Sequence, residues 1–236
     1  MDLSIIIPAY KSIEILHQQL PILLAWASSW EYKTEVIVVV DGDNLSTYSE
    51  ILKQFPVLVT GYEKNMGKGF AIKHGFKVST APLIIFTDAD IPFSRQNMLE
   101  IADALGANVN KKVWAIGDRT LPGSTYFEHI STLRKAGSDF FLLIIKHTLG
   151  KEFADTQCGL KGFTRDAGEM VLSKSYVNRF AFDFECLFIA RHHKIEIIKF
   201  PVNLRNQSDS TVSIFRDGWK VLKDVFKIIF WHNYDR

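Results

Sequence analysis

The stretch Leu83-Ile84-Ile85-Phe86-Thr87-Asp88-Ala89-Asp90 places two carboxylates directly after four consecutive apolar residues. A short, continuous apolar run of this kind predicts a strand that is covered on both faces of its sheet. Similar runs recur through the first 118 residues, and each of them ends in a polar turn. These runs predict four more strands, at 3–7, 35–40, 57–60 and 113–116.

Helical patterns separate these strands, at 13–28, 44–54, 67–79 and 95–107. Strands that alternate with helices predict an α/β protein with a doubly wound, mostly parallel sheet and helices on both faces. The later sequence predicts a long helix, a strand-like segment, two shorter helices, a strand and a final helix, at 126–148, 155–163, 166–173, 183–193, 195–202 and 214–232. The chain has no internal repeat and no linker, so we expect one domain over 1–236.

The composition is that of a folded globular protein, with 47% hydrophobic and 23% charged residues. A net charge of +2 and the lack of a basic run argue against a nucleic-acid partner. The first residues do not resemble a signal peptide, and no apolar window is long enough to cross a membrane. Cys158 and Cys186 have no metal-ligand spacing and suit a reducing compartment. We therefore expect a cytoplasmic protein that is attached, at most, to a membrane surface.

Polar residues gather after nearly every predicted strand. Right-handed crossovers would place all the strand carboxyl ends at one edge, where open α/β sheets bind their ligands. The residues concerned are Tyr10, Lys11, Asp41, Asp43, the segment 63–68, Asp88, Asp90, Asp118 and Arg119. Asp and Gly are also common in turns, but turn formation explains one such loop better than five.

Asp88 and Asp90 are candidate ligands of Mg²⁺ or Mn²⁺. Two carboxylates this close repel each other unless a cation joins them, and oxygen ligands favour these two ions over zinc. Two protein ligands would leave positions open for substrate phosphates. The alternative is a turn in which one aspartate caps the helix that begins near Ser94.

The segment Asn65-Met66-Gly67-Lys68-Gly69 opens the third helix. Glycines at a helix start let backbone N–H groups approach an anion, and Lys68 adds positive charge. The P-loop spacing is absent, and no Gly-x-Gly-x-x-Gly follows the first strand, which argues against a dinucleotide cofactor.

Several motifs together resemble the inverting glycosyltransferases of family two, which have the GT-A fold. The motifs are Ile5-Ile6-Ile7-Pro8-Ala9-Tyr10, Val39-Val40-Asp41-Gly42-Asp43, Asn65-x-Gly67-Lys68-Gly69 and Asp88-Ala89-Asp90. The segment Asp155-Thr156-Gln157-Cys158-Gly159-Leu160-Lys161-Gly162-Phe163 is similar to that of dolichyl-phosphate glucosyltransferases and, more loosely, of dolichyl-phosphate mannose synthases. The resemblance covers nearly the whole chain. It implies a nucleotide-sugar half at 1–118, an acceptor half with a closing loop at 119–213, and a C-terminal amphipathic helix at 214–236.

The resemblance also implies roles for single residues. Pro8, Tyr10 and Asp41 would border the nucleotide base and ribose. Asp88 and Asp90 would bind the metal, with the Ala89 backbone beside the diphosphate. The three arginines that would face an acceptor phosphate are Arg119, Arg134 and Arg205, the last of them in the closing loop.

The chain departs from the family pattern at three places. Lys11-Ser12 stands where the family usually has Asn-Glu, Pro92 where mannose synthases often have Gln, and Ser210-Thr211 where Ser-Lys is usual. The resemblance therefore leaves the donor base and the sugar open, between UDP- and GDP-hexoses and between glucose and mannose.

The chemistry of the acceptor follows from charge. A phosphate monoester is largely dianionic at neutral pH, so it needs arginines to neutralise and aim it rather than a base to deprotonate it. If the acceptor is a hydroxyl instead, a general base is required. Asp155, Asp183 and Glu185 are candidates for that base, although Asp183 and Glu185 could equally cap a helix.

The last helix carries an apolar stripe beside a basic one. The stripe consists of Phe215, Trp219, Leu222, Phe226 and Ile229, flanked by Arg216, Lys220, Lys223 and Lys227, with Phe230 and Trp231 near its end. This pattern suits a helix in a membrane interface, through 214–231, or a helix that packs on the sheet with its lysines in water. The apolar block at 140–145 has the same two interpretations.

The first hypothesis is a metal-dependent, inverting hexosyltransferase with a polyprenyl- or dolichyl-type phosphate as acceptor. The second keeps the nucleotide sugar but transfers to a hydroxyl of a glycan or small molecule. A third is a non-catalytic nucleotide-binding adaptor, against which the intact pair Asp88 and Asp90 argues.

Overall fold

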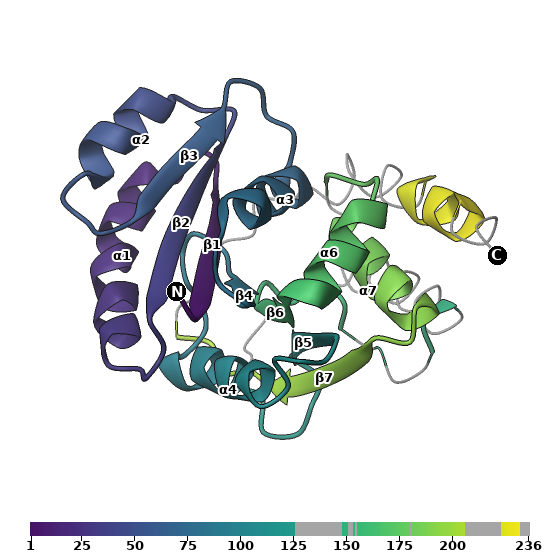
Figure 1. Ribbon diagram of the computed structural model, residues 1–236. Coiled ribbons are helices and arrows are strands. Elements are labelled where there is room, and N and C mark those ends of the chain that lie inside the picture. The colour runs from purple at the N-terminus through teal and green to yellow at the C-terminus, as the bar shows by residue number, and fades with distance from the viewer. Residues whose placement is uncertain (126–147, 151–152, 154, 180, 206–222, 232–236) are drawn as a thin grey trace.

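The computed structural model describes residues 1–125, 148–150, 153, 155–179, 181–205 and 223–231 (Figure 1). In these ranges the strands form one sheet in the order β3-β2-β1-β4-β6-β5-β7. The strands are β1 (Leu3–Ala9), β2 (Thr34–Asp41), β3 (Leu58–Tyr62), β4 (Leu83–Phe86), β5 (Val113–Asp118), β6 (Lys161–Thr164) and β7 (Glu196–Pro201). The helices are α1 (Ile13–Ser28), α2 (Leu45–Leu52), α3 (Lys68–Val78), α4 (Arg95–Gly106), α6 (Arg165–Lys174) and α7 (Phe182–His192), and residues 223–231 are helical too.

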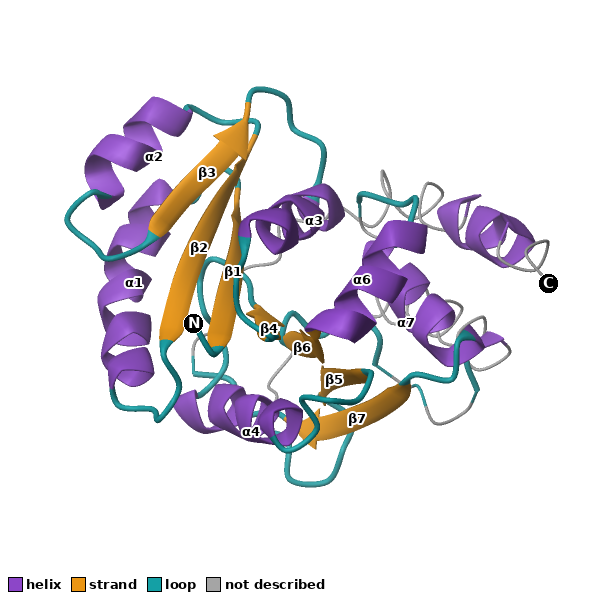
Figure 2. Cartoon of the chain, viewed as in Figure 1, coloured by secondary structure: helices purple, strands orange, loops and turns teal. Residues whose placement is uncertain are grey.

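Helices cover both faces of the sheet, as the sequence predicts (Figure 2). Side chains alternate between the faces of a strand, so neighbouring residues enter different cores. Ile5 and Ile7 belong to the core that includes residues of α1, α2 and α4, whereas Ile6 and Phe86 belong to the core beneath α3, α6 and α7. All four side chains are fully buried. The continuous apolar runs are therefore strands with two covered faces.

One strand runs against the others. β6 pairs antiparallel with both β4 and β5, with Phe86 opposite Lys161. The expectation that all strand carboxyl ends lie at one edge is therefore wrong for β6, whose amino end lies there instead. The expectation of a strand-like segment over 155–163 is also only partly right, because the strand begins at Lys161 and residues 155–160 precede it as irregular chain. This arrangement brings the irregular segment to the carboxyl end of β4.

The other elements agree with the predicted ones to within a few residues. The described part of the last predicted helix, 223–231, is helical, with Val225 and Ile228 buried in the core beneath α3, α6 and α7. The predicted helix at 126–148 and the residues 214–222 lie almost wholly outside the described residues, and with them the apolar block at 140–145.

Candidate functional site

The loop after β4 forms a tight turn around the two aspartates. The Ile91 N–H donates to the Asp88 carbonyl oxygen at 3.0 Å, and Ile91 is fully buried with φ +44°. A β-branched residue rarely adopts this left-handed conformation, and backbone strain of this kind concentrates at functional loops. Ser94 caps α4 by accepting from the Asn97 N–H at 3.2 Å. The alternative in which an aspartate caps this helix is therefore wrong.

Gly159 lies directly against the Asp88 carboxylate. A Cβ added to Gly159 would stand 1.9 Å from Asp88 Oδ2, which is closer than any real contact. Only glycine therefore lets the segment before β6 approach Asp88 so closely. The antiparallel direction of β6 is what brings this glycine to the end of β4.

Two lysines and two aspartates form a charged cluster at this edge, here defined as Lys68, Asp88, Lys161 and Asp183. Lys68 Nζ lies 2.5 Å from Asp88 Oδ1, and Lys161 Nζ lies 2.8 Å from Asp183 Oδ1. Both pairs lie near the ring of Phe86, whose centroid is 5.9 Å from Lys68 Nζ and 5.8 Å from Lys161 Nζ.

The two pairs differ in exposure. The side chains of Lys68 and Asp88 are 31% and 42% exposed, whereas those of Lys161 and Asp183 are 1% and 8% exposed. Burial alone would lower the pKa of Lys68, but the charges of Asp88 and, next, Asp183 raise it above its usual value. Lys68 therefore remains a cation that interacts with both carboxylates.

Asp41 organises the glycine-containing loop before α3. Its carboxylate accepts from the Met66 N–H at 2.7 Å and from the Gly67 N–H at 2.9 Å, and the residue is 5% exposed. Gly67 adopts φ +99°, which glycine tolerates without strain. The backbone N–H groups that the sequence assigns to an external anion thus bind the Asp41 carboxylate. The predicted contact of Asp41 with the nucleotide is not tested by this geometry.

The end of β1 presents an aromatic side chain to solvent. Tyr10 is 47% exposed, and Lys11 Nζ lies 5.4 Å from the centre of its ring. Lys11 adopts φ +51°, and its N–H donates to Asp43 Oδ2 at 3.0 Å. Pro8 is the neighbour of Val39 across the β1–β2 pair. The carboxyl ends of the adjacent strands β1 and β2 therefore hold Pro8, Tyr10 and Asp41. The roles of these residues at the base and ribose stay predictions.

Arg119 and Asp155 form a bidentate pair. Arg119 Nε and Nη2 donate to the two Asp155 carboxylate oxygens at 2.6 and 2.8 Å, and the Arg119 N–H donates to Oδ2 at 3.0 Å. Burial would raise the pKa of Asp155, but these hydrogen bonds and the guanidinium charge hold it below its usual value. A carboxylate held in this way is a weak base. The hydrogen bonds that Asp155 accepts from Arg119 fix the orientation of the Arg119 guanidinium.

Of the other two predicted arginines, Arg205 contacts a different element. Arg205 Nη2 donates to Gln19 Oε1 at 3.3 Å, and its guanidinium lies 4.7 Å from the centre of the Trp26 ring, so it contacts α1. The Arg205 N–H also donates to the Pro92 carbonyl oxygen at 2.7 Å, which ties its backbone to the loop after Asp90. Arg134 and the pair Ser210-Thr211 lie outside the described residues.

Asp183 and Glu185 both lie in the first turn of α7, but neither caps it, because Ala181 is the N-cap residue. Glu185 is fully buried and accepts from the N–H groups of Tyr176 and Val177 at 3.0 and 2.8 Å. It therefore holds the chain between α6 and α7. Asp183, by contrast, belongs to the charged cluster.

Gly159 and Lys161 are the contributors that the sequence reasoning missed. The one signal in the sequence is a lysine between small residues, Leu160-Lys161-Gly162, where a strand covered on both faces is expected to be apolar. A lysine in such a strand must be buried, and a buried ammonium requires a carboxylate partner.

The residues present fit a divalent cation that is completed by its substrate. Among the described residues no group of three or more His, Cys, Asp and Glu side chains is positioned to hold an ion alone. Asp88 and Asp90 would supply oxygen ligands, the type that Mg²⁺ and Mn²⁺ prefer, and Gly159 leaves open the space beside Asp88 that a Cβ would fill. Phosphate oxygens of a substrate would provide the remaining ligands.

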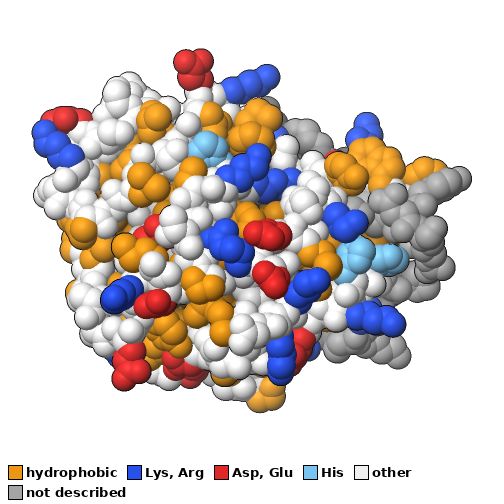
Figure 3. Space-filling view, viewed as in Figure 1, with side chains coloured by type: hydrophobic (Ala, Val, Ile, Leu, Met, Phe, Trp, Pro, Cys, Tyr) orange, Lys and Arg blue, Asp and Glu red, His pale blue; other side chains and the backbone are white. Residues whose placement is uncertain are grey.

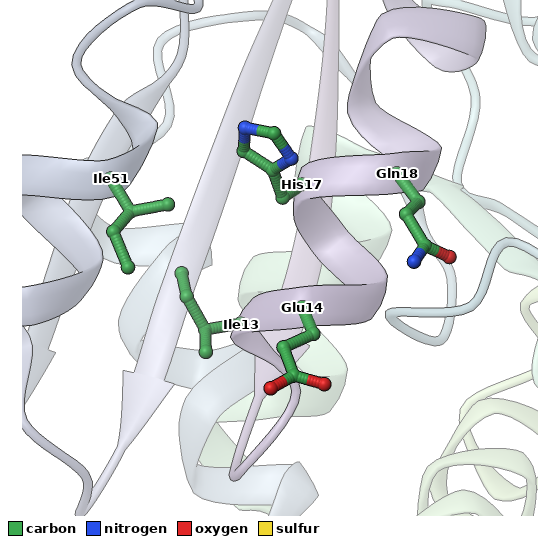
Figure 4. A pocket seen from close by; sticks show the side chains of 5 residues that line it. All are labelled: Ile13, Glu14, His17, Gln18 and Ile51. Carbon is green, nitrogen blue, oxygen red and sulfur yellow. The ribbon is translucent and has the colours of Figure 1, made fainter.

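A shallow depression of about 380 Å³ lies between α1 and α2 (Figure 4). It is lined by Ile13, Glu14, His17, Gln18 and Ile51. None of the residues of the charged cluster contributes to it, so we assign it no part in the chemistry at Asp88.

Two proteins that are similar to this chain in sequence carry the same name. A dolichyl-phosphate beta-glucosyltransferase of Homo sapiens is 31% identical to this chain in an alignment that covers 96% of this chain and 74% of the relative. One from Trichomonas vaginalis is 30% identical over 223 residues, which cover 89% of this chain and 68% of the relative.

Solved structures share the fold at low sequence identity. The mannosyl-3-phosphoglycerate synthase of Rubrobacter xylanophilus matches with a TM-score of 0.72 and 13% identity, over 99% of this chain and 75% of that one. The glucosyl-3-phosphoglycerate synthase of Mycobacterium tuberculosis, in complex with Mn²⁺, UDP and glucosyl-3-phosphoglycerate, matches with a TM-score of 0.66 and 11% identity, over 96% of this chain and 79% of that one. These neighbours are GT-A glycosyltransferases, so the predicted GT-A fold is confirmed.

Residues 4–170 match the profile of the family described as Glycosyl transferase family 2, which spans β1 to α6 and includes Asp88 and Asp90. The family, the fold and the carboxylates after β4 agree, and the adaptor hypothesis is set aside because the chain is a glycosyltransferase. The chain belongs to glycosyltransferase family 2.

Proposed function

We propose that this protein transfers glucose, with inversion, from a nucleotide diphosphate glucose to a dolichyl- or polyprenyl-type phosphate, and that it requires a divalent metal. The observation that carries the proposal is the pair Asp88 and Asp90 after β4, with Lys68 and Gly159 packed against Asp88. Relatives that are 30 and 31% identical to this chain over the aligned region are named as dolichyl-phosphate beta-glucosyltransferases, which supports glucose over mannose.

Asp88 and Asp90 would hold the ion, which supplies positive charge for the leaving diphosphate. Lys68 adds a second positive charge at the same edge. In the transfer, a phosphate oxygen of the acceptor forms a bond to the anomeric carbon. The bond from that carbon to the donor diphosphate breaks, and the nucleoside diphosphate leaves with the electron pair. No proton has to be removed from the acceptor, because a phosphate monoester is already largely ionised at neutral pH.

The state of the acidic residues supports a phosphate acceptor. Asp155 is engaged by Arg119 with its pKa lowered, and Asp183 is engaged by Lys161. Both carboxylates are therefore occupied by cations, whereas a general base for a hydroxyl works best with a pKa near the operating pH. Arg119 would orient the acceptor phosphate, since it is itself held rigidly through Asp155.

The C-terminal helix supports contact with a membrane surface. Val225 and Ile228 are buried, while Phe226, Phe230 and Trp231 are 63%, 62% and 45% exposed, and Lys223 and Lys227 are exposed beside them. The exposed Tyr176, from the chain after α6, meets the Trp231 ring edge-on at 5.8 Å. Hydrophobic side chains gather at the end of the molecule that carries this helix (Figure 3).

These residues define the apolar end as Tyr176, Phe226, Phe230 and Trp231. Aromatic rings beside lysines suit the interface of a membrane that contains anionic lipid. In the described ranges no helix is long and apolar enough to cross a membrane. The exposed rings and lysines of the C-terminal helix support contact with the membrane surface that holds the lipid acceptor.

The test is transfer of label into lipid. Purified protein with Mn²⁺ or Mg²⁺, a polyprenyl phosphate, and radiolabelled UDP-glucose or GDP-glucose in separate reactions should give a product that partitions into organic solvent. Asp88→Asn and Asp90→Asn should each lower the rate by at least about 100-fold, because each removes one ligand of the ion. Chelation of the metal should abolish transfer in the wild type.

A hydroxyl acceptor is the competing function. Label that enters a water-soluble glycan or small molecule, with none in the lipid fraction for either donor, would contradict the proposal. Label that enters lipid equally well with chelator present would contradict its metal requirement.

A further inference from the structure

The Lys68 ammonium and a bound divalent ion would compete for the same oxygen of Asp88, Oδ1. The Lys68 ammonium lies 2.5 Å from Asp88 Oδ1, which is within direct ion-pair contact. The side chains of Lys68 and Asp88 are 31% and 42% exposed, so an ion from solvent can approach the same carboxylate. Gly159 lies on the side of the other oxygen, Oδ2, where an added Cβ would stand 1.9 Å from that oxygen. A divalent ion that binds Asp88 through Oδ1 has to displace Lys68 from that oxygen or share the oxygen with it.

A second carboxylate, that of Asp183, lies in the same charged cluster as Lys68. Its partner Lys161 and Lys68 have their Nζ atoms 5.8 and 5.9 Å from the centre of the same Phe86 ring. Asp183 is itself paired with the buried Lys161, so the pair presents little net charge. Asp183 can therefore attract a displaced Lys68 but cannot fully replace Asp88 as its partner. A nucleotide diphosphate carries negatively charged oxygens and can replace Asp88 as the partner of Lys68.

The neighbourhood restricts how far Lys68 can move. Its backbone begins α3, directly after Gly67, and the Gly69 N–H is anchored to the Asn178 carbonyl oxygen at 2.8 Å. The Phe86 ring lies on one side of the ammonium, with its centroid 5.9 Å away. Only the flexible side chain is free to change partner, and a lysine stem has the rotatable bonds to do so.

We infer that Lys68 is a built-in competitor of the metal at Asp88, which a nucleotide diphosphate removes by taking Lys68 as its own counter-charge. The ion alone then binds weakly, because it has to break the Lys68–Asp88 pair. The ion and the diphosphate together bind more tightly than either alone, because the diphosphate stabilises the displaced ammonium. Such coupling is reciprocal, so the metal strengthens nucleotide binding by the same factor.

This inference rests on the metal requirement in the proposed function, but its test needs neither acceptor nor transfer. The measurement is the dissociation constant of Mn²⁺, by calorimetry or by the relaxation of water protons, alone and with saturating UDP or GDP. A lack of glucosyl transfer would therefore leave the inference standing. Asp88→Asn serves as the reference for binding elsewhere on the protein.

Lys68→Met keeps the length of the side chain and removes its charge. Mn²⁺ alone should bind this variant about 3- to 10-fold more tightly than the wild type, the range expected for loss of one partly exposed competing charge. The strengthening of Mn²⁺ binding by the nucleotide should shrink in the same variant. Lys68→Arg, which retains the charge, should behave more like the wild type.

The matched control is Lys77→Met, which removes the same charge from the exposed last turn of the same helix. It should leave both Mn²⁺ constants unchanged, so a general effect of net charge is separated from competition at Asp88. Circular dichroism of each variant shows whether it is folded, and Lys68→Gln provides a second neutral variant.

Equal or weaker binding of Mn²⁺ alone by folded Lys68→Met and Lys68→Gln would overturn the inference. So would an undiminished effect of the nucleotide on Mn²⁺ binding in these variants. If neither the wild type nor Lys68→Met binds Mn²⁺ in an Asp88-dependent manner, the inference also fails.

Discussion

At the scale of single residues, the site depends on how closely Asp88 can be approached. Gly159 reaches its Oδ2 only because it has no Cβ, and Lys68 reaches its Oδ1 through an ion pair. The sequence identifies Asp88, Asp90 and Lys68 because each lies in a recognisable local motif. It does not identify Gly159 or Lys161 as their neighbours, because those contacts join segments that lie far apart in the chain.

Gly159→Ala tests the close approach at Asp88. The added Cβ would meet the end of a partly exposed side chain, so Asp88 should turn aside at little cost in stability. Displacing a metal ligand in this way should lower metal-dependent transfer by roughly 10- to 100-fold. Gly106→Ala is the matched control, because its Cβ would meet the Tyr32 hydroxyl at 2.9 Å, away from the site.

Thermal unfolding and transfer rates of the two glycine variants are the measurements. A Gly159→Ala enzyme with wild-type activity would show that Asp88 does not need the contact. A large fall in melting temperature would show instead that the backbone, rather than the Asp88 side chain, gives way.

At the scale of elements, the direction of β6 decides the chemistry of the sheet edge. Five early strands could be predicted because continuous β-branched runs are the signal of strands with two covered faces. The direction of β6 could not be predicted, because the sequence of a four-residue strand, Lys161–Thr164, does not indicate which strands it pairs with or in which direction. The position of Arg205 could not be predicted either, because it contacts Gln19 and Trp26, which lie near the other end of the chain.

The pair Lys161–Asp183 joins β6 to α7, and its stability effect can be predicted from burial. Lys161→Met or Asp183→Leu would leave the other charge buried and unpaired, which should destabilise the protein by about 3–5 kcal/mol. The double variant Lys161→Met with Asp183→Leu removes both charges and should recover much of that loss. Unfolding in urea measures all four proteins.

Additive losses in the double variant would contradict this description, because they would mean that the two side chains act independently. The activity of the double variant is informative as well. If transfer to lipid phosphate persists without Asp183, that residue is not an obligatory base.

At the scale of the whole molecule, two places would serve the proposed lipid substrate. One is the sheet edge with the charged cluster, and the other is the apolar end formed by Tyr176, Phe226, Phe230 and Trp231. The sequence predicts an amphipathic helix over 214–232, but only the fold shows that Tyr176 lies beside it, since the Tyr176–Trp231 contact links two distant segments. The long predicted helix at 126–148 stays a prediction, and so does the role of Arg134.

Membrane contact through the apolar end can be measured by flotation with vesicles. The wild type should float with vesicles of phosphatidylcholine and phosphatidylglycerol better than with phosphatidylcholine alone, because Lys223 and Lys227 lie beside the aromatic rings. Trp231→Ser together with Phe226→Ser should abolish most of this binding. Leu58→Ser is the matched control, since Leu58 on β3 is 46% exposed, against 45% for Trp231.

Equal flotation of the Leu58→Ser control and the aromatic double variant would show that the apolar end is not the contact surface. Transfer to a short, water-soluble polyprenyl phosphate should be unaffected by the aromatic changes, because they leave the charged cluster intact.

The central claim is that the chain joins glucose to a lipid phosphate with inversion, and the product itself decides it most directly. Phosphorus and proton NMR of the purified lipid product should show glucose bonded through its anomeric carbon to the phosphate oxygen, in the β configuration when the donor is α-linked. Glucose attached to a hydroxyl, or an α-linked glucosyl phosphate, would contradict the claim.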